Sequence, residues 1–256
     1  MNEKFAGAFS LEGKTAFITG GGTGLGFAMA DSLASAGAQV ILAGRREDVL
    51  KEACRKIGKK AGYVQFDVTE TDRTESLVSA LQNEYGHLDI LINNAGRHCK
   101  KPFSEVTQED LQKVLDVHIL GHYALTRAVL PGMIERRDGS VIFISSMSAY
   151  LAMTQVCAYG TAKSAVLGLV KTLSGEVSEY GVRVNAIAPG FIDTPMFRQA
   201  TDGDPARQQK ILGHTPMARY GKPEDVGWAA VYLAAPASRF VTGVCLPVDG
   251  GCAIGF

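Results

Sequence analysis

The stretch TAFITGGGTGLG, residues 15–26, decides the architecture of this 256-residue chain. TAFIT is a short apolar and β-branched run typical of a buried strand, and the segment after the glycines has apolar residues at helical spacing. Glycines at such a junction let the backbone approach a phosphate, and the helix start offers free N–H groups to its negative charge. The stretch predicts a strand, a phosphate-binding turn and a helix, with a merely tight turn as the alternative.

The same alternation continues along the chain. Six further short apolar runs follow, at 39–43, 62–66, 88–93, 140–145, 182–188 and 243–248. Between them lie segments of helical spacing that stop at a glycine, such as 27–37, 45–58 and 71–86. Because parallel strands need crossover connections, this pattern predicts an α/β fold: one Rossmann-like, doubly wound sheet of about seven parallel strands with helices on both faces.

We expect a single domain over residues 1–256, since no repeat or linker marks a second one. Residues 195–222 carry prolines and mixed charge without a strand pattern. Such an irregular stretch between regular elements is expected to cross the sheet edge as a substrate lid.

Composition narrows the class of partner. Lysine plus arginine and aspartate plus glutamate balance at 26 each, so no net field favours nucleic acid or an anionic membrane. The N-terminus lacks a signal-peptide core, and no window reaches the roughly 18 apolar residues of a membrane span. Five scattered cysteines without CxxC pairs favour a reducing, cytoplasmic location and no metal site. The expected partner is a small molecule.

In an open parallel sheet, ligands bind at the carboxyl ends of the strands. Asp67 follows the third run and either accepts from an adenine amino group or caps the next helix. NNAG, residues 93–96, follows the fourth run, where the asparagines can bridge backbone groups and Gly96 lets a cofactor pass. Ser145 and Ser146 follow the fifth run, and PG at 189–190 follows the sixth.

A further pattern lies in CAYGTAKSAV, residues 157–166, where Tyr159 precedes Lys163 by four residues. On a helix these two side chains share a face. A free phenol has a pKa of about 10, so a tyrosine base near neutral pH needs about 4 kcal/mol of phenolate stabilisation, part of which a cation supplies. The spacing fits a packed tyrosine and a solvated lysine equally well.

Together these motifs resemble the short-chain dehydrogenase/reductase family over nearly the whole chain. TGGGTGLG (19–26) matches its TGxxxGxG loop, NNAG matches outright, VDGG (248–251) fits, and Ser146 lies thirteen residues before Tyr159. The resemblance implies an NAD(P)-dependent oxidoreductase acting on CH–OH groups. It also implies that Tyr159 is the general acid/base, that Ser146 holds the substrate oxygen, and that Lys163 lowers the tyrosine pKa and bonds the nicotinamide ribose.

The resemblance also implies the cofactor contacts, at strand ends and on the helix of Tyr159. They are Gly20, Gly22, Thr23, Gly24, Leu25, Gly26, Arg45, Arg46, Asp67, Val68, Asn94, Ala95, Gly96, Tyr159, Lys163, Pro189, Gly190, Ile192 and Thr194. Gly44 stands where an acid would bind the NAD ribose, and Arg45 follows, suited to a 2′-phosphate. NADP is therefore favoured over NAD; the alternative is a pair of solvated arginines and tolerance of either cofactor.

One position departs from the family pattern. His118 stands where the family usually has an asparagine that helps to hold a water in the proton path behind the lysine. Histidine also donates and accepts hydrogen bonds, so it either preserves this relay or is a packed, satisfied residue. We include His118 among the catalytic candidates and leave both readings open.

The substrate class rests on RHCKKPF, residues 97–103, which would border the cleft. Its basic side chains suit a carboxylated or phosphorylated substrate, although a solvated loop is the commoner meaning of such a run. This segment and TPMARYGKPED (215–225) resemble the gluconate 5-dehydrogenase branch. We therefore rank a sugar acid or polyol first, a 3-oxoacyl thioester second, and a non-catalytic dinucleotide-binding module third. Candidate substrate contacts are Arg97, Ser148, Met153 and Cys157.

The family resemblance also implies a homotetramer. Residues 165–177 and the ending 248–256 are apolar enough to pack between subunits, and internal core is the alternative for both.

Overall fold

Seven parallel strands form one sheet in the computed structural model, which describes residues 3–255. The strands are β1 (Thr15–Thr19), β2 (Gln39–Gly44), β3 (Ala61–Gln65), β4 (Ile90–Asn93), β5 (Gly139–Ile144), β6 (Val182–Pro189) and β7 (Cys245–Val248). Every adjacent pair is parallel. The predicted α/β class and the seven predicted strands are confirmed, with ends that differ by one or two residues.

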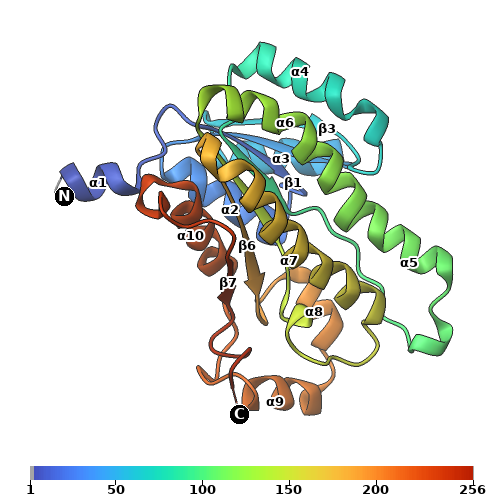
Figure 1. Cartoon of the computed structure of the whole chain (residues 1–256). Helices are drawn as coiled ribbons and strands as arrows, with labels where there is room; N and C mark the ends of the chain where they lie inside the picture. Colours follow the sequence, from blue (N-terminus) through green and yellow to red (C-terminus); the bar gives the residue numbers. More distant parts are fainter. Residues whose placement is uncertain (1–2, 256) are drawn as a thin grey trace.

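Helices cover both faces of this sheet (Figure 1). They are α1 (Glu3–Phe9), α2 (Gly24–Ser35), α3 (Glu47–Ile57), α4 (Thr74–Tyr85), α5 (Gln108–Leu115), α6 (His122–Arg136), α7 (Cys157–Val177), α8 (Pro195–Thr201), α9 (Pro205–Gly213) and α10 (Pro223–Ala234). The sequence pattern did not predict α1, which buries no residue and points away from the sheet in Figure 1. Within residues 3–255, no helix has the length and apolar character needed to cross a membrane.

The core is divided between the two faces because successive strand residues point in opposite directions. Ile18 of β1 packs in the cluster that includes α2, α3 and α10, whereas its neighbour Phe17 packs in the cluster of α4, α6 and α7. Both side chains are fully buried. A sheet that is apolar on both faces explains why the strands appear in the sequence as continuous hydrophobic runs.

The strand order β3-β2-β1-β4-β5-β6-β7 reverses direction between β1 and β4. The chain first moves outward from β1 to β3, then returns to β4 and moves outward on the other side. The crossovers that leave β1 and β4 therefore diverge and open a crevice at the carboxyl ends of these strands. The glycine turn and NNAG both lie at this switch point.

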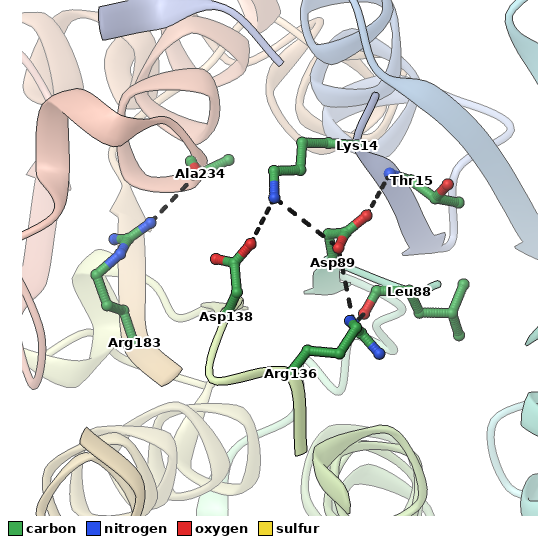
Figure 2. A network of polar contacts seen from close by, with 8 residues as sticks. All are labelled: Lys14, Thr15, Leu88, Asp89, Arg136, Asp138, Arg183 and Ala234. Atoms are coloured by element: carbon green, nitrogen blue, oxygen red, sulfur yellow. Dashed lines mark hydrogen bonds and ion pairs between the residues drawn. The ribbon is translucent and has the colours of Figure 1, made fainter. Parts of the chain in front are cut away.

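The opposite, amino end of the sheet is held by a network of charges (Figure 2). Asp89, just before β4, is 8% exposed and accepts a hydrogen bond from the Thr15 N–H at 2.9 Å. Its other oxygen lies 4.0 Å from the Lys14 amine and 3.7 Å from the Arg136 guanidinium. Lys14 also pairs with Asp138, which precedes β5. The network ties together the starts of three adjacent strands.

The irregular region 195–222 contains α8 and α9, which lie beyond the carboxyl end of β6 (Figure 1). Each helix begins with a proline that follows an N-cap residue: the Thr194 hydroxyl accepts from the Phe197 N–H, and the Asp204 carboxylate accepts from the Arg207 N–H. A parallel bridge between Ile192 and Gly221 closes the base of the excursion.

Candidate active site

The glycine turn after β1 has the shape that a diphosphate needs. Gly20 and Gly24 have φ angles of +64° and +55°, which favour glycine, and a Cβ on Gly26 would lie 2.1 Å from the Gly20 carbonyl. The side chain of Thr23, the N-cap of α2, makes no capping hydrogen bond, and the first turn carries no acidic residue. The helix start therefore suits an anion, and the turn fits the phosphates of a dinucleotide.

Asn94 fastens this turn to the end of β4. Its amide donates to the Thr19 carbonyl at 2.8 Å and to the Gly20 carbonyl at 3.2 Å. The Thr19 hydroxyl accepts from the backbone N–H groups of Asn94 and Ala95, both at 2.9 Å. The preceding Asn93 is fully buried and donates to the Thr126 hydroxyl at 2.9 Å. Asn94 thus joins the end of β4 to the end of β1, as the NNAG pattern indicated, and Asn93 joins β4 to α6.

The adenosine end of such a ligand would meet Arg45 and Asp67. Arg45 follows β2 with its side chain 78% exposed, and its guanidinium lies 3.9 Å from the Asp67 carboxylate. Asp67 accepts from the N–H and the hydroxyl of Thr69, so it closes a turn and does not cap the next helix. Val68 is buried and its carbonyl packs against Gly121, where a Cβ would come within 2.4 Å. Arg46 is also exposed, at the start of α3.

Further along the sheet, β6 ends at Pro189, and Gly190 follows it. The Gly190 N–H donates to the Val248 carbonyl at 3.0 Å, and a Cβ on Gly190 would lie 2.6 Å from the Asp249 Cα. The backbone bridge to Gly221 uses the Phe191 carbonyl and the Asp193 N–H. The N–H and carbonyl of Ile192 therefore point away from Gly221, as the groups of alternate residues do in a parallel pair. Thr194, the last residue predicted here, caps α8.

The structure brings Ser146, Tyr159 and Lys163 together. Ser146 follows β5, where its hydroxyl accepts from the Ser148 N–H at 3.1 Å and is near enough to the Tyr159 phenol to lower the pKa of that phenol. The Lys163 amine lies 5.5 Å from the centre of the Tyr159 ring. It donates to the Ile144 carbonyl at 2.6 Å, while the Ser145 hydroxyl donates to the Lys163 carbonyl at 3.0 Å. These two bonds fix α7 against the end of β5.

Burial controls the protonation of this pair. It raises the pKa of Tyr159, because the charged phenolate is less well solvated, while the Ser146 hydrogen bond acts in the opposite direction. Lys163 is 2% exposed, and burial lowers its pKa to about 7. The lysine thus exchanges its proton near neutral pH instead of being a permanent ammonium. Lys163 can therefore lower the tyrosine pKa, as expected, only while its amine carries a proton.

His118 belongs to a π-helical turn, η3 (Asp116–Gly121), that joins α5 to α6 and brings its side chain into the site. It is 1% exposed, and its Nε2 lies 3.0 Å from the Arg97 N–H nitrogen and 2.9 Å from the Arg97 carbonyl oxygen. Burial, with the Lys163 charge, lowers the pKa of His118 to about 3, so its imidazole is neutral. Its ring meets that of Tyr159 edge-on, with centroids 5.4 Å apart.

One turn further along, His122 is also 1% exposed. Burial places the pKa of His122 well below the usual value, and the backbone of Ala95 and His118 acts in the opposite direction. His118 Nδ1 and His122 Nε2 have no hydrogen-bond partner among the described residues. Sequence reasoning missed His122, although its spacing of four from His118 on a helical segment indicates a shared face.

His98 is the second residue whose position the sequence did not predict. The sequence placed His98 only among the basic side chains of residues 97–103. In the structure its ring stacks on that of Tyr159, with centroids 4.8 Å apart and planes at 10°. Partial burial lowers the pKa of His98, and the charges of Lys100, Arg207 and Lys163 act in the same direction. Because Arg207 belongs to α9, this helix brings positive charge within electrostatic range of His98.

The four predicted substrate contacts differ in exposure and in the partners that they already have. Arg97 is exposed, and its backbone holds His118. Ser148 has a buried hydroxyl with no partner among the described residues, Met153 is 36% exposed, and Cys157 is the exposed first residue of α7. Lys101, another basic residue of the segment 97–103, forms an ion pair with Asp110 at 2.7 Å. No group of three metal-ligating side chains occurs among residues 3–255.

A doubly wound sheet with a diphosphate turn at its switch point, beside a serine, a tyrosine and a buried lysine, defines a nicotinamide-dependent dehydrogenase or reductase. A short-chain dehydrogenase family model, described as enoyl-(acyl carrier protein) reductase, matches residues 20–253. The chain belongs to the short-chain dehydrogenase/reductase family and is an oxidoreductase.

Individual relatives extend this comparison. A 2-dehydro-3-deoxy-D-gluconate 5-dehydrogenase from Formosa agariphila is 36% identical over 248 residues, which cover 95% of this chain and 94% of the relative. A 3-oxoacyl-(acyl-carrier-protein) reductase from Thermotoga maritima is 35% identical over 95% of this chain and 99% of its own. The crystal structure of a gluconate 5-dehydrogenase from Burkholderia cenocepacia, in complex with NADP and tartrate, has a TM-score of 0.93 at 32% identity and covers 98% of this chain and 100% of that one.

Proposed function

We propose that this chain oxidises or reduces a sugar acid, or a related polyol, with NADP as cofactor. The observation that carries the proposal is the positive charge on the substrate side of the phenol, where Lys100, Arg207 and Lys163 all act on His98 beside Tyr159. A carboxylate on the substrate would be attracted to this side of the cleft. Relatives named for gluconate derivatives, and a similar structure that holds tartrate, support the same substrate class.

In this proposal each residue of the site has one task. When bound, the nicotinamide ring supplies the hydride acceptor or donor. The Ser146 hydroxyl holds the substrate oxygen beside the Tyr159 phenol, whose pKa it lowers. Tyr159 takes the proton from an alcohol during oxidation and returns it to a carbonyl oxygen during reduction.

Lys163 passes this proton onward, for which a pKa of about 7 is suited because the amine gains and loses a proton readily at neutral pH. Its amine has three donors, so it can bond the nicotinamide ribose as well as the Ile144 carbonyl. His118 lies against Tyr159 as a neutral imidazole whose Nδ1 has no partner among the described residues, so this nitrogen is available to the proton path. This supports the relay reading of His118, in which the imidazole replaces the usual asparagine.

The preference for NADP rests on the end of β2. Gly44 offers no carboxylate to a ribose 2′-hydroxyl, and the Arg45 guanidinium is 78% exposed beside Asp67. An arginine there forms a charge-assisted contact with a 2′-phosphate. The phosphate turn from Gly20 to Gly26, with Asn94 and Gly96 facing it, would hold the remainder of the cofactor.

The second candidate is a 3-oxoacyl thioester. The T. maritima relative carries that name, and the exposed Arg97 and Lys100 would suit the phosphate of an acyl carrier's pantetheine arm. We also propose that residues 195–222 close over the substrate as a lid within a single domain spanning 1–256. The electrostatic effect of Arg207 on His98 supports this, because it brings α9 within range of the cleft.

We further propose a cytoplasmic homotetramer. The five cysteines are free thiols, which suits a reducing compartment. Trp228, Phe240 and Ile254 are 55%, 101% and 88% exposed, and such large apolar side chains would be buried between subunits in this proposal. Phe256, the end of the predicted interface segment, lies outside the described residues. Light scattering coupled to size exclusion would give the mass of the assembly.

The test of function is an initial-rate assay that follows nicotinamide absorbance. NADP(H) and NAD(H) are each crossed with gluconate, 5-ketogluconate, other sugar acids, polyols and acetoacetyl thioesters. Turnover of a sugar acid, faster with NADP, is the expected result. Turnover of the thioester alone would establish the second candidate instead, and cofactor binding without turnover of any substrate would indicate a non-catalytic dinucleotide-binding module.

A further inference from the structure

The imidazole rings of His98 and His118 both pack against the ring of Tyr159. The His98 ring lies parallel to it, with centroids 4.8 Å apart and planes at 10°. The His118 ring meets it at 83°, with centroids 5.4 Å apart. Offset stacking and edge-to-face contact are the two arrangements that aromatic rings prefer. The tyrosine ring therefore has one partner that covers its face and another that packs perpendicular to it.

The segment that carries His98 is fastened on both sides. Immediately before it, the backbone N–H and carbonyl of Arg97 both lie within 3.0 Å of His118 Nε2. Three residues after it, the Lys101 N–H donates to the Gln155 carbonyl at 2.9 Å, just before α7 begins. His98 is thus tied to η3 on one side and to the start of the Tyr159 helix on the other, although much of its own surface stays exposed.

We propose that His98 is a positioning residue, whose stacked imidazole holds the Tyr159 ring so that the phenol oxygen points at Ser146 and the substrate. The proposal rests on the proposed function, in which Tyr159 exchanges the proton. Proton transfer requires the two oxygens to stay within hydrogen-bond distance, and a small rotation of the tyrosine ring moves the phenol oxygen out of that range. The positive charges near His98 favour its neutral form, so it stacks as an aromatic ring.

Two variants separate stacking from the other properties of histidine. His98→Ala removes the ring, and we expect kcat to fall about tenfold while KM changes less than about twofold, because orientation and not binding is lost. His98→Phe keeps a flat ring without nitrogens, and we expect kcat within about threefold of the wild type. His87→Ala is the matched control, since His87 is an exposed histidine at the opposite end of the sheet.

A second readout needs no substrate. In protein labelled with 3-fluorotyrosine, the ¹⁹F resonance of residue 159 is the one that disappears in Tyr159→Phe. Loss of the stacked ring in His98→Ala should shift this resonance, His98→Phe should restore most of the shift, and His87→Ala should leave it in place. If the wild type turned over none of the substrates, the proposed function would fail while the resonance would still test the stack.

Three results would overturn the proposal. The first is a resonance that does not move in His98→Ala, which would mean that the rings do not stack in solution. The second is a kcat for His98→Ala within twofold of the wild type. The third is a His98→Phe variant as slow as His98→Ala, which would assign the effect to the imidazole nitrogens and not to the ring.

Discussion

The amine of Lys163 lies 5.5 Å from the centre of the Tyr159 ring and donates to the carbonyl of Ile144. The lysine is therefore held by the end of β5 as well as by its own helix. Its position beside the phenol does not depend on whether its amine is charged.

Replacing Tyr159 by Phe removes the phenol oxygen and leaves the ring that His98 and His118 contact. We expect kcat to fall about 10³-fold, the usual loss when a general acid or base is removed. Binding of NADPH, measured by the quenching of Trp228, the single tryptophan, should change by less than about threefold. A variant that keeps even a tenth of the activity would exclude Tyr159 as the proton donor.

Replacing Lys163 by Met should separate activity from stability. Loss of the relay and of the ribose contact should lower kcat/KM by at least about 100-fold. At pH 7, however, the free energy of unfolding should rise by about 3 kcal/mol. Relief of the burial that lowers the amine pKa to about 7 adds about 4 kcal/mol, and loss of the donor to the Ile144 carbonyl costs about 1 kcal/mol. Lys171→Met, at an exposed position of the same helix, is the control. Urea unfolding measures the change, and a destabilised Lys163→Met would contradict the argument.

Replacing Arg45 by Asp should reverse the cofactor preference. The carboxylate repels a 2′-phosphate and accepts from a ribose hydroxyl, so kcat/KM for NADP should fall about 100-fold while that for NAD rises. Lys59→Asp makes the same change of charge at an exposed position beyond the far end of α3. If both variants lowered activity with NADP equally, Arg45 would act only through the overall charge of the protein and not through a contact with the 2′-phosphate.

Acid should destabilise the fold through His118. Its pKa of about 3 in the folded chain lies below the ordinary 6.5, so between these values the unfolded chain binds a proton that the folded chain does not. Stability is therefore lost as the pH falls below about 6.5. From pH 7 to pH 5, His118 should account for about 2 kcal/mol of this loss.

The comparison is between His118→Asn and His87→Asn, each unfolded in urea at pH 7 and pH 5. His118→Asn should lose about 2 kcal/mol less on acidification than the wild type, whereas His87→Asn should follow the wild type. His122 adds to the acid sensitivity of all three proteins, since its pKa is also well below the usual value. Equal losses in all three would show that His118 is protonated in the folded state.

Asp89→Ala should be the most destabilising change in the charge network. It removes the acceptor of the Thr15 N–H and leaves the half-buried charge of Arg136 without its carboxylate partner, a loss of about 3 kcal/mol. Asp138→Ala, whose side chain is 59% exposed, should cost less than about 1 kcal/mol. Thermal unfolding of both variants tests the order, and a larger effect at Asp138 would reverse it.

The sheet could be predicted from the sequence because its strands are buried on both faces and so form unbroken apolar runs. The helices before Gly58 and Gly86 were equally clear, since both glycines have the positive φ that ends a helix. α1 was missed because no apolar face of it packs on the sheet. The N-caps and prolines of α8 and α9 were present in the sequence, but prolines at a first turn were read as a sign of irregular structure.

At the site, fixed motif spacings could place Ser146, Tyr159 and Lys163 near one another, since a helix and a strand end have known geometry. The stack of His98 on Tyr159 could not be predicted, because it depends on how a loop folds back over a helix more than fifty residues later. The pKa of Lys163 was beyond reach for a similar reason: burial sets it, and burial is a property of the whole fold.

The charge network of Lys14, Asp89, Arg136 and Asp138 fastens the amino ends of the strands, whereas every residue of the proposed site lies at their carboxyl ends. The length of the strands separates the two. Segments at the carboxyl end, such as 97–103 and 195–222, are therefore free to be exchanged with those of relatives to redirect substrate choice, without weakening the ties that keep the scaffold folded.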